Sequence, residues 1–245
     1  MLNFFDKISI YQDAGLSILT ASLAYFLHLS IFHSKRIKKN LSKRFGEKKI
    51  TIYLILLQRC SGFLLYGIIP AFIVIISFSK NVLSYGLSPV NFSKSLSWTL
   101  GLSALIIPLG ILNARNSSNQ KKYPQIRTNE WNRYLLLLSA SSWMIYLFAY
   151  EFLLRGMLFF SCLESFGFWP ALSINVLIYA VFHLHKNKNE VIGSVLIGIV
   201  FCIMTFKTGT IWAAFFSHVI LALSNEWASI YFNPEMKIKW SRKQK

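Results

Sequence analysis

The hydrophobic positions of the chain fall into long runs that short polar segments separate. The apolar runs lie near residues 13–33, 61–79, 96–113, 132–165, 170–185, 190–207 and 211–232. A helix needs about 20 apolar residues to cross the hydrocarbon core of a bilayer. The run lengths therefore predict an all-α fold, a polytopic transmembrane helix bundle of about seven to eight helices. The fourth run is too long for one straight crossing and predicts a tilted or kinked span.

The composition agrees with a membrane location. Of the 245 residues, 54% are hydrophobic and 14% are charged, whereas a soluble domain of this length needs more charge to cover its surface. The net charge of +17 could indicate nucleic-acid binding, but the basic residues lie in short segments between apolar runs, as they do on the cytoplasmic side of membrane proteins. We therefore expect the lipid bilayer, and no nucleic acid, as a partner.

The distribution of Lys and Arg predicts the orientation. Twenty of the 26 lie in 34–49, 114–134, 186–189 and 233–245. Four, Lys7, Lys80, Lys94 and Lys207, are expected on the opposite side, and Arg59 and Arg155 are the other two. Seven crossings would bring the four basic segments to one face, which is expected to be cytoplasmic. We expect an integral, multi-pass protein of a bacterial plasma membrane with its C-terminus in the cytoplasm.

Ionisable side chains inside a bilayer are costly, so those within apolar runs mark candidate sites. Glu151 and Arg155 are four residues apart and lie on one helical face. His183 lies in the fifth run and His218 in the last. One carboxylate, one guanidinium and two imidazoles on three helices predict an intramembrane polar cluster. A purely structural ion pair between Glu151 and Arg155 is the alternative, although it leaves the two histidines unexplained.

The other polar residues of the runs are expected at membrane boundaries. Arg59 is placed near the inner boundary, where its side chain can extend to the headgroups. His28 and His33 are expected at the inner end of the first run, and Glu164 and Glu226 near span ends, within reach of water.

The cluster predicts hydrolytic chemistry. A carboxylate that faces imidazoles in a restricted cavity can take a proton from water, while a histidine assists and a hydrogen-bond donor stabilises the oxyanion. The sequence contains no HExxH motif, and Cys60, Cys162 and Cys202 form no ligand-spaced pair. The spacing therefore gives a metal site no support and does not exclude one.

These segments resemble the CAAX-protease and bacteriocin-processing family of intramembrane proteases, also called Abi proteins. The family pattern is EExxxRG on one helix, FxxxH on the next, and HxxxN or a similar polar ending on a later one. The matching positions are Glu151 to Gly156 for the first motif from its second glutamate onward, Tyr179 to His183 for the second, and His218 for the start of the third. The resemblance covers roughly residues 123–228.

The resemblance implies a glutamate-dependent endopeptidase that needs no metal or cofactor and cleaves a membrane-associated protein or peptide. It implies four catalytic positions: Glu151 as the base, His183 as its partner, His218 as an oxyanion or substrate contact, and Arg155 as a structural clamp. It also implies three segments, namely N-terminal membrane spans over 1–122, the protease core over 123–232 and a basic cytoplasmic tail over 233–245.

Two positions depart from the family pattern. The first glutamate of the first motif, which activates water in the family, is Tyr150 here, and the last asparagine of the third motif is Ala222, with Asn225 about one turn further on. A catalytically silent protein that acts by binding, for instance in bacteriocin immunity, is therefore an alternative. A transporter or proton relay is a third hypothesis, although the inverted repeats typical of transporters are not evident.

The run limits also place the two histidines at different depths. His183 is expected near the cytoplasmic end of its helix, whereas His218 is expected about 10 Å from the outer end of its own helix. The two residues can meet only if the helices tilt or the limits shift.

Overall fold

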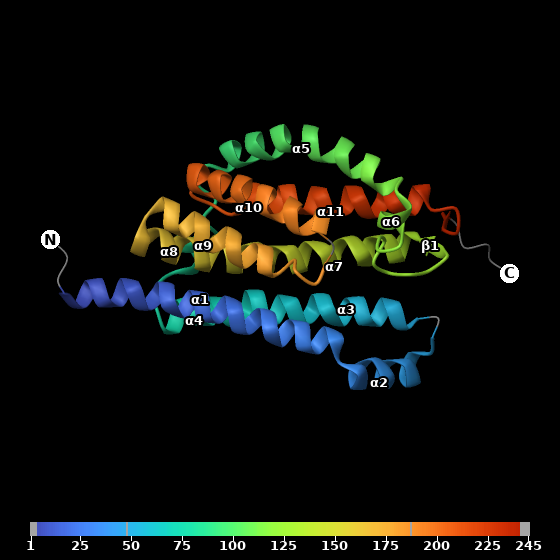
Figure 1. Ribbon diagram of the computed structural model, residues 1–245, viewed down its shortest axis with the longest axis horizontal. Helices are drawn as coiled ribbons and strands as arrows, with labels where there is room; N and C mark the ends of the chain where they lie inside the picture. Colours follow the sequence, from blue (N-terminus) through green and yellow to red (C-terminus); the bar gives the residue numbers. More distant parts are fainter. Residues whose placement is uncertain (1–3, 48, 187, 241–245) are drawn as a thin grey trace.

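The computed structural model describes residues 4–47, 49–186 and 188–240 and is a bundle of roughly aligned helices (Figure 1). The elements in chain order are α1 (Phe4–His33), α2 (Lys35–Phe45), α3 (Ile50–Phe63), the π-helical η1 (Leu64–Ile68), α4 (Ile69–Ile76), the 3-10 turn η2 (Val82–Tyr85), α5 (Phe92–Ala114), α6 (Ser117–Gln120), β1 (Glu130–Asn132), α7 (Arg133–Glu151), the π-helical η3 (Phe152–Leu158), α8 (Phe159–Phe166), α9 (Phe168–Val181), α10 (Lys188–Thr208), α11 (Trp212–Phe232) and β2 (Lys237–Lys239). The predicted all-α class is confirmed, with one short parallel pairing of β1 with β2 as the addition.

Among the described residues, five helices are long and apolar enough to cross a bilayer. They cover Tyr11–His33, Ile50–Ile76, Phe92–Ala114, Arg133–Phe166 and Lys188–Thr208. Large apolar side chains such as Leu23, Phe72 and Leu100 are exposed on their outer faces, as lipid-facing side chains are. The chain is therefore an integral membrane protein. The number of crossings stays a prediction, because α9 is apolar but shorter.

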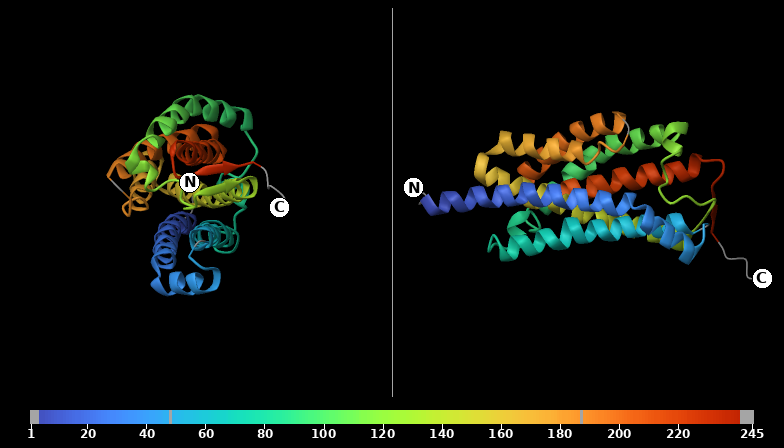
Figure 2. Two further views of the ribbon diagram at one scale, coloured as in Figure 1. Left: turned by 90° about the vertical axis from the view of Figure 1, so that its right-hand side faces the viewer. Right: turned by 60° about the horizontal axis from the view of Figure 1, so that its bottom comes forward.

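The fourth apolar run forms the central helix of the bundle. It is continuous from Arg133 to Phe166 and is buried over 78% of its most apolar window, against 28% to 39% for the other four spans. Viewed along the bundle, α1 and α3 lie on one side of α7, and α5 and α11 lie on the other (Figure 2). The helix contains the π-helical segment η3, and the predicted tilt or kink of this run stays a prediction.

Most of the described basic segments gather at one end of the bundle. This end, which we call the basic end, carries α2, α6, β1 and the end of α11, whereas α1 starts at the opposite end (Figure 1). This gathering is the arrangement that the distribution of Lys and Arg predicts for segments 34–49, 114–134 and 233–240, whereas the number of crossings stays a prediction. Which compartment the basic end faces stays a prediction, and the last basic residues of the expected tail, 241–245, lie outside the described residues.

Candidate active site

One long helix carries the first two candidate residues. Glu151 is the last residue of α7, and Arg155 lies in η3, which follows without a break. The expected pairing is present, with Arg155 Nε 3.4 Å from Glu151 Oε2. A π-helical segment changes the angular spacing of side chains, and such segments are frequent at functional sites. The helix is thus irregular at the point where it presents these two charges.

Gly156 allows a neighbouring segment to approach η3 closely. A Cβ at this position would lie 2.8 Å from the backbone oxygen of Tyr85 in η2 and 2.9 Å from the Phe152 ring. A larger side chain would therefore displace the backbone of η2. The glycine next to Arg155 thus has a packing reason that is separate from the chemistry.

Glu151 contacts partners on two helices. Its Oε1 lies 2.6 Å from Nδ1 of His218 in α11, while its Oε2 faces Arg155, and both side chains of the Glu151–Arg155 pair are fully buried. The Arg155 guanidinium also lies over the ring of Tyr179 in α9, 4.2 Å from its centre. A buried carboxylate needs compensation by charge and hydrogen bonds. Here a cation and an imidazole provide it, so the pair is part of a contact among three helices.

The Glu151 contact fixes the tautomer of His218. Because a carboxylate accepts hydrogen bonds, Nδ1 of His218 carries the proton, and Nε2 of the neutral ring remains a free acceptor. The His218 side chain is 13% exposed and lines a cavity. A histidine that a carboxylate holds in this way can accept a proton at Nε2, as in hydrolases that use a carboxylate–histidine pair.

His183 has the same tautomer for a different reason. Its Nδ1 lies 2.8 Å from the carbonyl oxygen of Tyr179, which can only accept, so Nδ1 carries the proton and Nε2 is again a free acceptor. The His183 ring packs against the Tyr179 ring at 4.6 Å between centres. In the part of the chain that the structure describes, no three or more His, Cys, Asp or Glu side chains are grouped to hold a metal ion.

Both histidines line one cavity of about 570 Å³. The cavity extends from His218 to the segment around Asn119 and Tyr123, which follows α5 at the basic end. Aromatic side chains form much of its wall near the histidines, namely Tyr25, Tyr66, Tyr146, Tyr150, Tyr179 and Phe182. The cavity therefore connects the Glu151–His218 contact to the basic end of the bundle.

The short length of α9 removes the expected conflict in depth. α9 has only 14 residues and ends at Val181, and the turn that joins it to α10 stops short of the basic end (Figure 1). His183 lies in this turn. It therefore lines the same cavity as His218, although the expected run, 170–185, would have carried it further.

The two positions that depart from the family pattern also line the cavity. The Tyr150 ring lies 5.8 Å from the His218 ring, between centres, and Ala222 is one turn along α11 from His218. Asn225 lines the cavity as well, and its Oδ1 accepts a hydrogen bond from Asn119 Nδ2 at 3.1 Å. A phenol and a displaced amide thus stand near the places where the family has a carboxylate and an asparagine.

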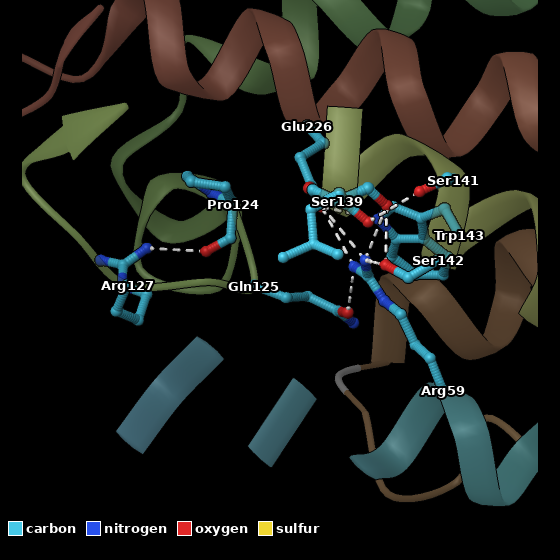
Figure 3. Close-up of polar contacts among 10 residues, drawn as sticks. Arg59, Pro124, Gln125, Arg127, Ser139, Ser141, Ser142, Trp143 and Glu226 are labelled. Atoms are coloured by element: carbon cyan, nitrogen blue, oxygen red, sulfur yellow. Dashed lines mark hydrogen bonds and ion pairs between the residues drawn. The ribbon is translucent and has the colours of Figure 1, made fainter. Parts of the chain in front are cut away.

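A second buried polar cluster surrounds Arg59 and Glu226 (Figure 3). Along α7 and α11 its residues lie between the first cluster and the basic end. Arg59 of α3 donates from Nη1 to the carbonyl oxygen of Ser139 at 2.9 Å and from Nη2 to Gln125 Oε1 at 3.1 Å. Glu226 of α11 lies 3.6 Å from Arg59 Nη2 and accepts from Trp143 Nε1 at 2.7 Å. The charged side chains are at most 3% exposed. Arg59 therefore joins α3 to α7 and α11 inside the bundle.

This second cluster corrects two predictions. Arg59 does not extend to the headgroups, and Glu226 does not reach water, because each neutralises the other inside the protein. The sequence did contain a signal for this pair. Arg59 lies just before one apolar run and Glu226 lies inside another, and neither has a partner nearby in sequence. Glu164, by contrast, is exposed as expected and pairs with Lys80 at the end opposite to the basic end.

His28 is also buried, whereas it was predicted at the membrane boundary. Its Nε2 lies 2.9 Å from the Gln58 carbonyl oxygen, and its Nδ1 lies 2.8 Å from the Tyr66 hydroxyl. His28 and Tyr66 both line the cavity, so the N-terminal spans form part of the wall of the site. His33 is exposed, as predicted.

The fold and the site together define a polytopic helical membrane protein with a buried carboxylate–arginine–histidine cluster at a cavity. Residues 131–224 match the family model described as Type II CAAX prenyl endopeptidase Rce1-like. This match supports the resemblance of the segment to the CAAX-protease and bacteriocin-processing family, whose general activity is that of a membrane endopeptidase. No curated protein and no solved structure matches the chain. The matched residues lie within the predicted core over 123–232, whose limits stay a prediction.

Proposed function

We propose that this protein is an intramembrane endopeptidase in which His218 activates water and Glu151 positions His218. The observation that carries the proposal is the 2.6 Å contact between Glu151 and His218 Nδ1, which leaves His218 Nε2 free at the cavity. This assigns the base to His218, whereas the sequence pattern assigned it to Glu151. The completely buried Glu151 carboxylate serves instead to orient the imidazole and to stabilise its protonated form.

The proposed reaction is a general-base hydrolysis. Water attacks the scissile carbonyl carbon while one of its protons passes to His218 Nε2. The tetrahedral intermediate then collapses, the C–N bond breaks, and His218 returns the proton to the leaving amine. His183 Nε2, the other free acceptor at the cavity, accepts the second hydrogen of the attacking water and so orients it.

Two further side chains support this chemistry. Arg155 balances the Glu151 charge while His218 is neutral. The buried carboxylate therefore has a cationic partner before and after the imidazolium forms at His218. The Tyr150 hydroxyl, at the cavity beside His218, donates a hydrogen bond to the developing oxyanion. In this proposal Tyr150 supports catalysis as a donor and does not replace the missing glutamate as a base.

The substrate is a membrane-associated protein or peptide that enters from the basic end. The cavity continues to that end. Its volume of about 570 Å³ lies within the roughly 300 to 1,000 Å³ that is usual for ligand-binding pockets. It suits a short extended stretch of peptide rather than a folded domain.

The second candidate is a silent member of the family that acts by binding, as in bacteriocin immunity. Tyr150 favours it, because this position lacks the water-activating carboxylate of the family. In this case the cavity would hold a peptide segment without cleaving it, and the cluster would only hold the helices together.

The deciding experiment compares the membrane and secreted peptides of cells that carry the wild type, a deletion, Glu151→Gln or His218→Ala. Protein abundance is matched by quantitative blotting. The endopeptidase predicts new peptide termini that occur with the wild type and disappear in the other three strains. A cellular effect of the deletion that neither variant reproduces would support the binding protein instead.

A kinetic measurement on the substrate so found separates positioning from folding. Glu151→Gln is nearly isosteric, and its amide oxygen can still accept a hydrogen bond from Nδ1, but it has no charge that stabilises the imidazolium. We therefore expect kcat to fall by about 10³ to 10⁴ with KM retained. Loss of protein, or parallel changes in kcat and KM, would mean that Glu151 is structural.

A further inference from the structure

α2 is a basic helix that the proposed chemistry does not use. Six of its 11 residues are Lys or Arg, its sequence KRIKKNLSKRF contains no acid, and none of its residues is buried. Lys38, Lys39 and Lys43 are exposed. A charged segment that served only to set the orientation of the chain would need neither a helix nor a fixed position.

One face of α2 fixes the helix to the bundle. Ser34 caps its start by accepting a hydrogen bond from the Ile37 amide at 3.3 Å. Ile37, Leu41 and Phe45 follow at intervals of four and are half-buried, so they form one stripe. Phe45 stacks on Tyr53 of α3, with 3.7 Å between ring centres. The cations are consequently directed away from α3.

The helix lies on the flank of the bundle. It crosses from the end of α1 to the start of α3, outside both helices (Figures 1 and 2). The last turns of α1, just before it, expose Leu27 by 55% and Phe32 by 39%. An apolar surface that passes into a basic one along a membrane protein marks the level at which hydrocarbon gives way to headgroups.

We propose that α2 is a binding surface for the headgroups of anionic phospholipids. The charge is complementary, since six cations meet no acid within the helix. The position of α2 also suits lipid, because α2 lies on the flank of the bundle, and the bilayer surrounds the flank and not the end of the bundle. Basic segments next to a membrane are attracted to anionic lipid in this way. The proposal is independent of the catalytic proposal, because it concerns neither the cavity nor its residues.

The test uses the full-length protein in nanodiscs of phosphatidylcholine, with or without about a third of phosphatidylglycerol. Hydrogen–deuterium exchange of the α2 amides is expected to be slower in the anionic discs, and added salt is expected to reduce the difference, because it screens exposed charges. The triple variant K38Q/K39Q/K43Q removes three of six cations and should lose roughly half of the lipid effect.

A matched control removes the same charge elsewhere. Lys121, Lys188 and Lys237 are also exposed and belong to the other basic segments, so K121Q/K188Q/K237Q should keep the lipid effect on α2. Equal exchange of α2 in both kinds of disc would overturn the proposal and make an acidic protein the occupant to test. Equal losses in the two triple variants would overturn it as well, because the effect would then follow net charge.

Discussion

Tyr150 places a phenol where the family motif has a carboxylate. The residue lies at the cavity and against the rings of Tyr66, Tyr146 and Tyr179, at 5.8 to 5.9 Å between centres. A carboxylate would be poorly accommodated among these rings, whereas a phenol combines an apolar body with a polar tip. In the proposed mechanism, the position therefore acts as a hydrogen-bond donor and not as a base.

Removal of the Tyr150 hydroxyl tests the proposed role of this residue as an oxyanion donor. Tyr150→Phe keeps the ring and its packing, so abundance should be unchanged, while kcat should fall by about 10² to 10³ if an oxyanion donor is lost. The measurement is the rate of appearance of the new peptide termini at matched protein levels. Unchanged turnover would show that Tyr150 is only part of the wall.

The Arg59–Glu226 pair provides a test of stability. Glu226→Gln leaves the Arg59 charge buried without its anion, and the expected cost is about 3 to 5 kcal/mol. The double variant R59M/E226L replaces both charges by apolar groups and should recover most of the loss. Denaturant titration in detergent micelles measures both. Equal stability of Glu226→Gln and the wild type would mean that water reaches the pair.

Gly156 tests the close approach of η2 to η3. Gly156→Ala puts a methyl group against the Tyr85 carbonyl, a backbone atom that cannot rotate away, and should lower stability by about 1 to 3 kcal/mol. Gly101→Ala is the control, because no atom lies within 4 Å of a Cβ there, and alanine favours a helix by roughly 1 kcal/mol. Similar melting temperatures for the two variants would contradict the packing argument.

At the scale of elements, the apolar runs predicted most of the helices, because their signal is local and strong. They missed the first half of the second span, since Arg59 interrupts the apolar pattern and only a partner on α11 makes its burial tolerable. They also missed the π segments η1 and η3, which arise from packing and have no simple sequence period. α9 is shorter than its run, because an apolar pattern does not say where a helix turns back.

The candidate site, like the helices, was predicted from the sequence only in part. The sequence predicted Glu151, Arg155, His183 and His218 as a polar cluster in apolar surroundings. In the structure Glu151 contacts Arg155 and His218, Arg155 and His183 pack against Tyr179, and both histidines line the cavity. The partner of each atom could not be predicted. The Glu151–His218 contact depends on how α7 and α11 cross, and the roles of His28 and Tyr66 depend on helices outside the matched segment.

At the scale of the whole molecule, the cavity has walls from both halves of the chain. His28, Arg59 and Tyr66 come from the N-terminal spans, and the two histidines of the site come from the family segment. The matched segment alone would therefore lack one side of its cavity. The N-terminal spans contribute to the site as well as to membrane insertion.

The orientation of the whole molecule can be measured directly. In a cysteine-free background, K94C near the start of α5 and K188C at the start of α10 should react with a membrane-impermeant thiol reagent from opposite sides of the membrane. K188C should react only after the cells are opened, since its segment is expected in the cytoplasm. Labelling of both positions from one side would require a different number of crossings.

The cavity opens toward one end of the bundle, and this has a consequence for the permeability of the membrane. The cavity begins at the basic end and reaches His218, while past Arg155 along the central helix Met157, Leu158 and Phe159 are completely buried. We therefore expect water to reach the proposed active site from the basic end. A hydrolase built in this way can draw its water and return its products through one compartment only, so the cell can run the reaction without dissipating its proton gradient.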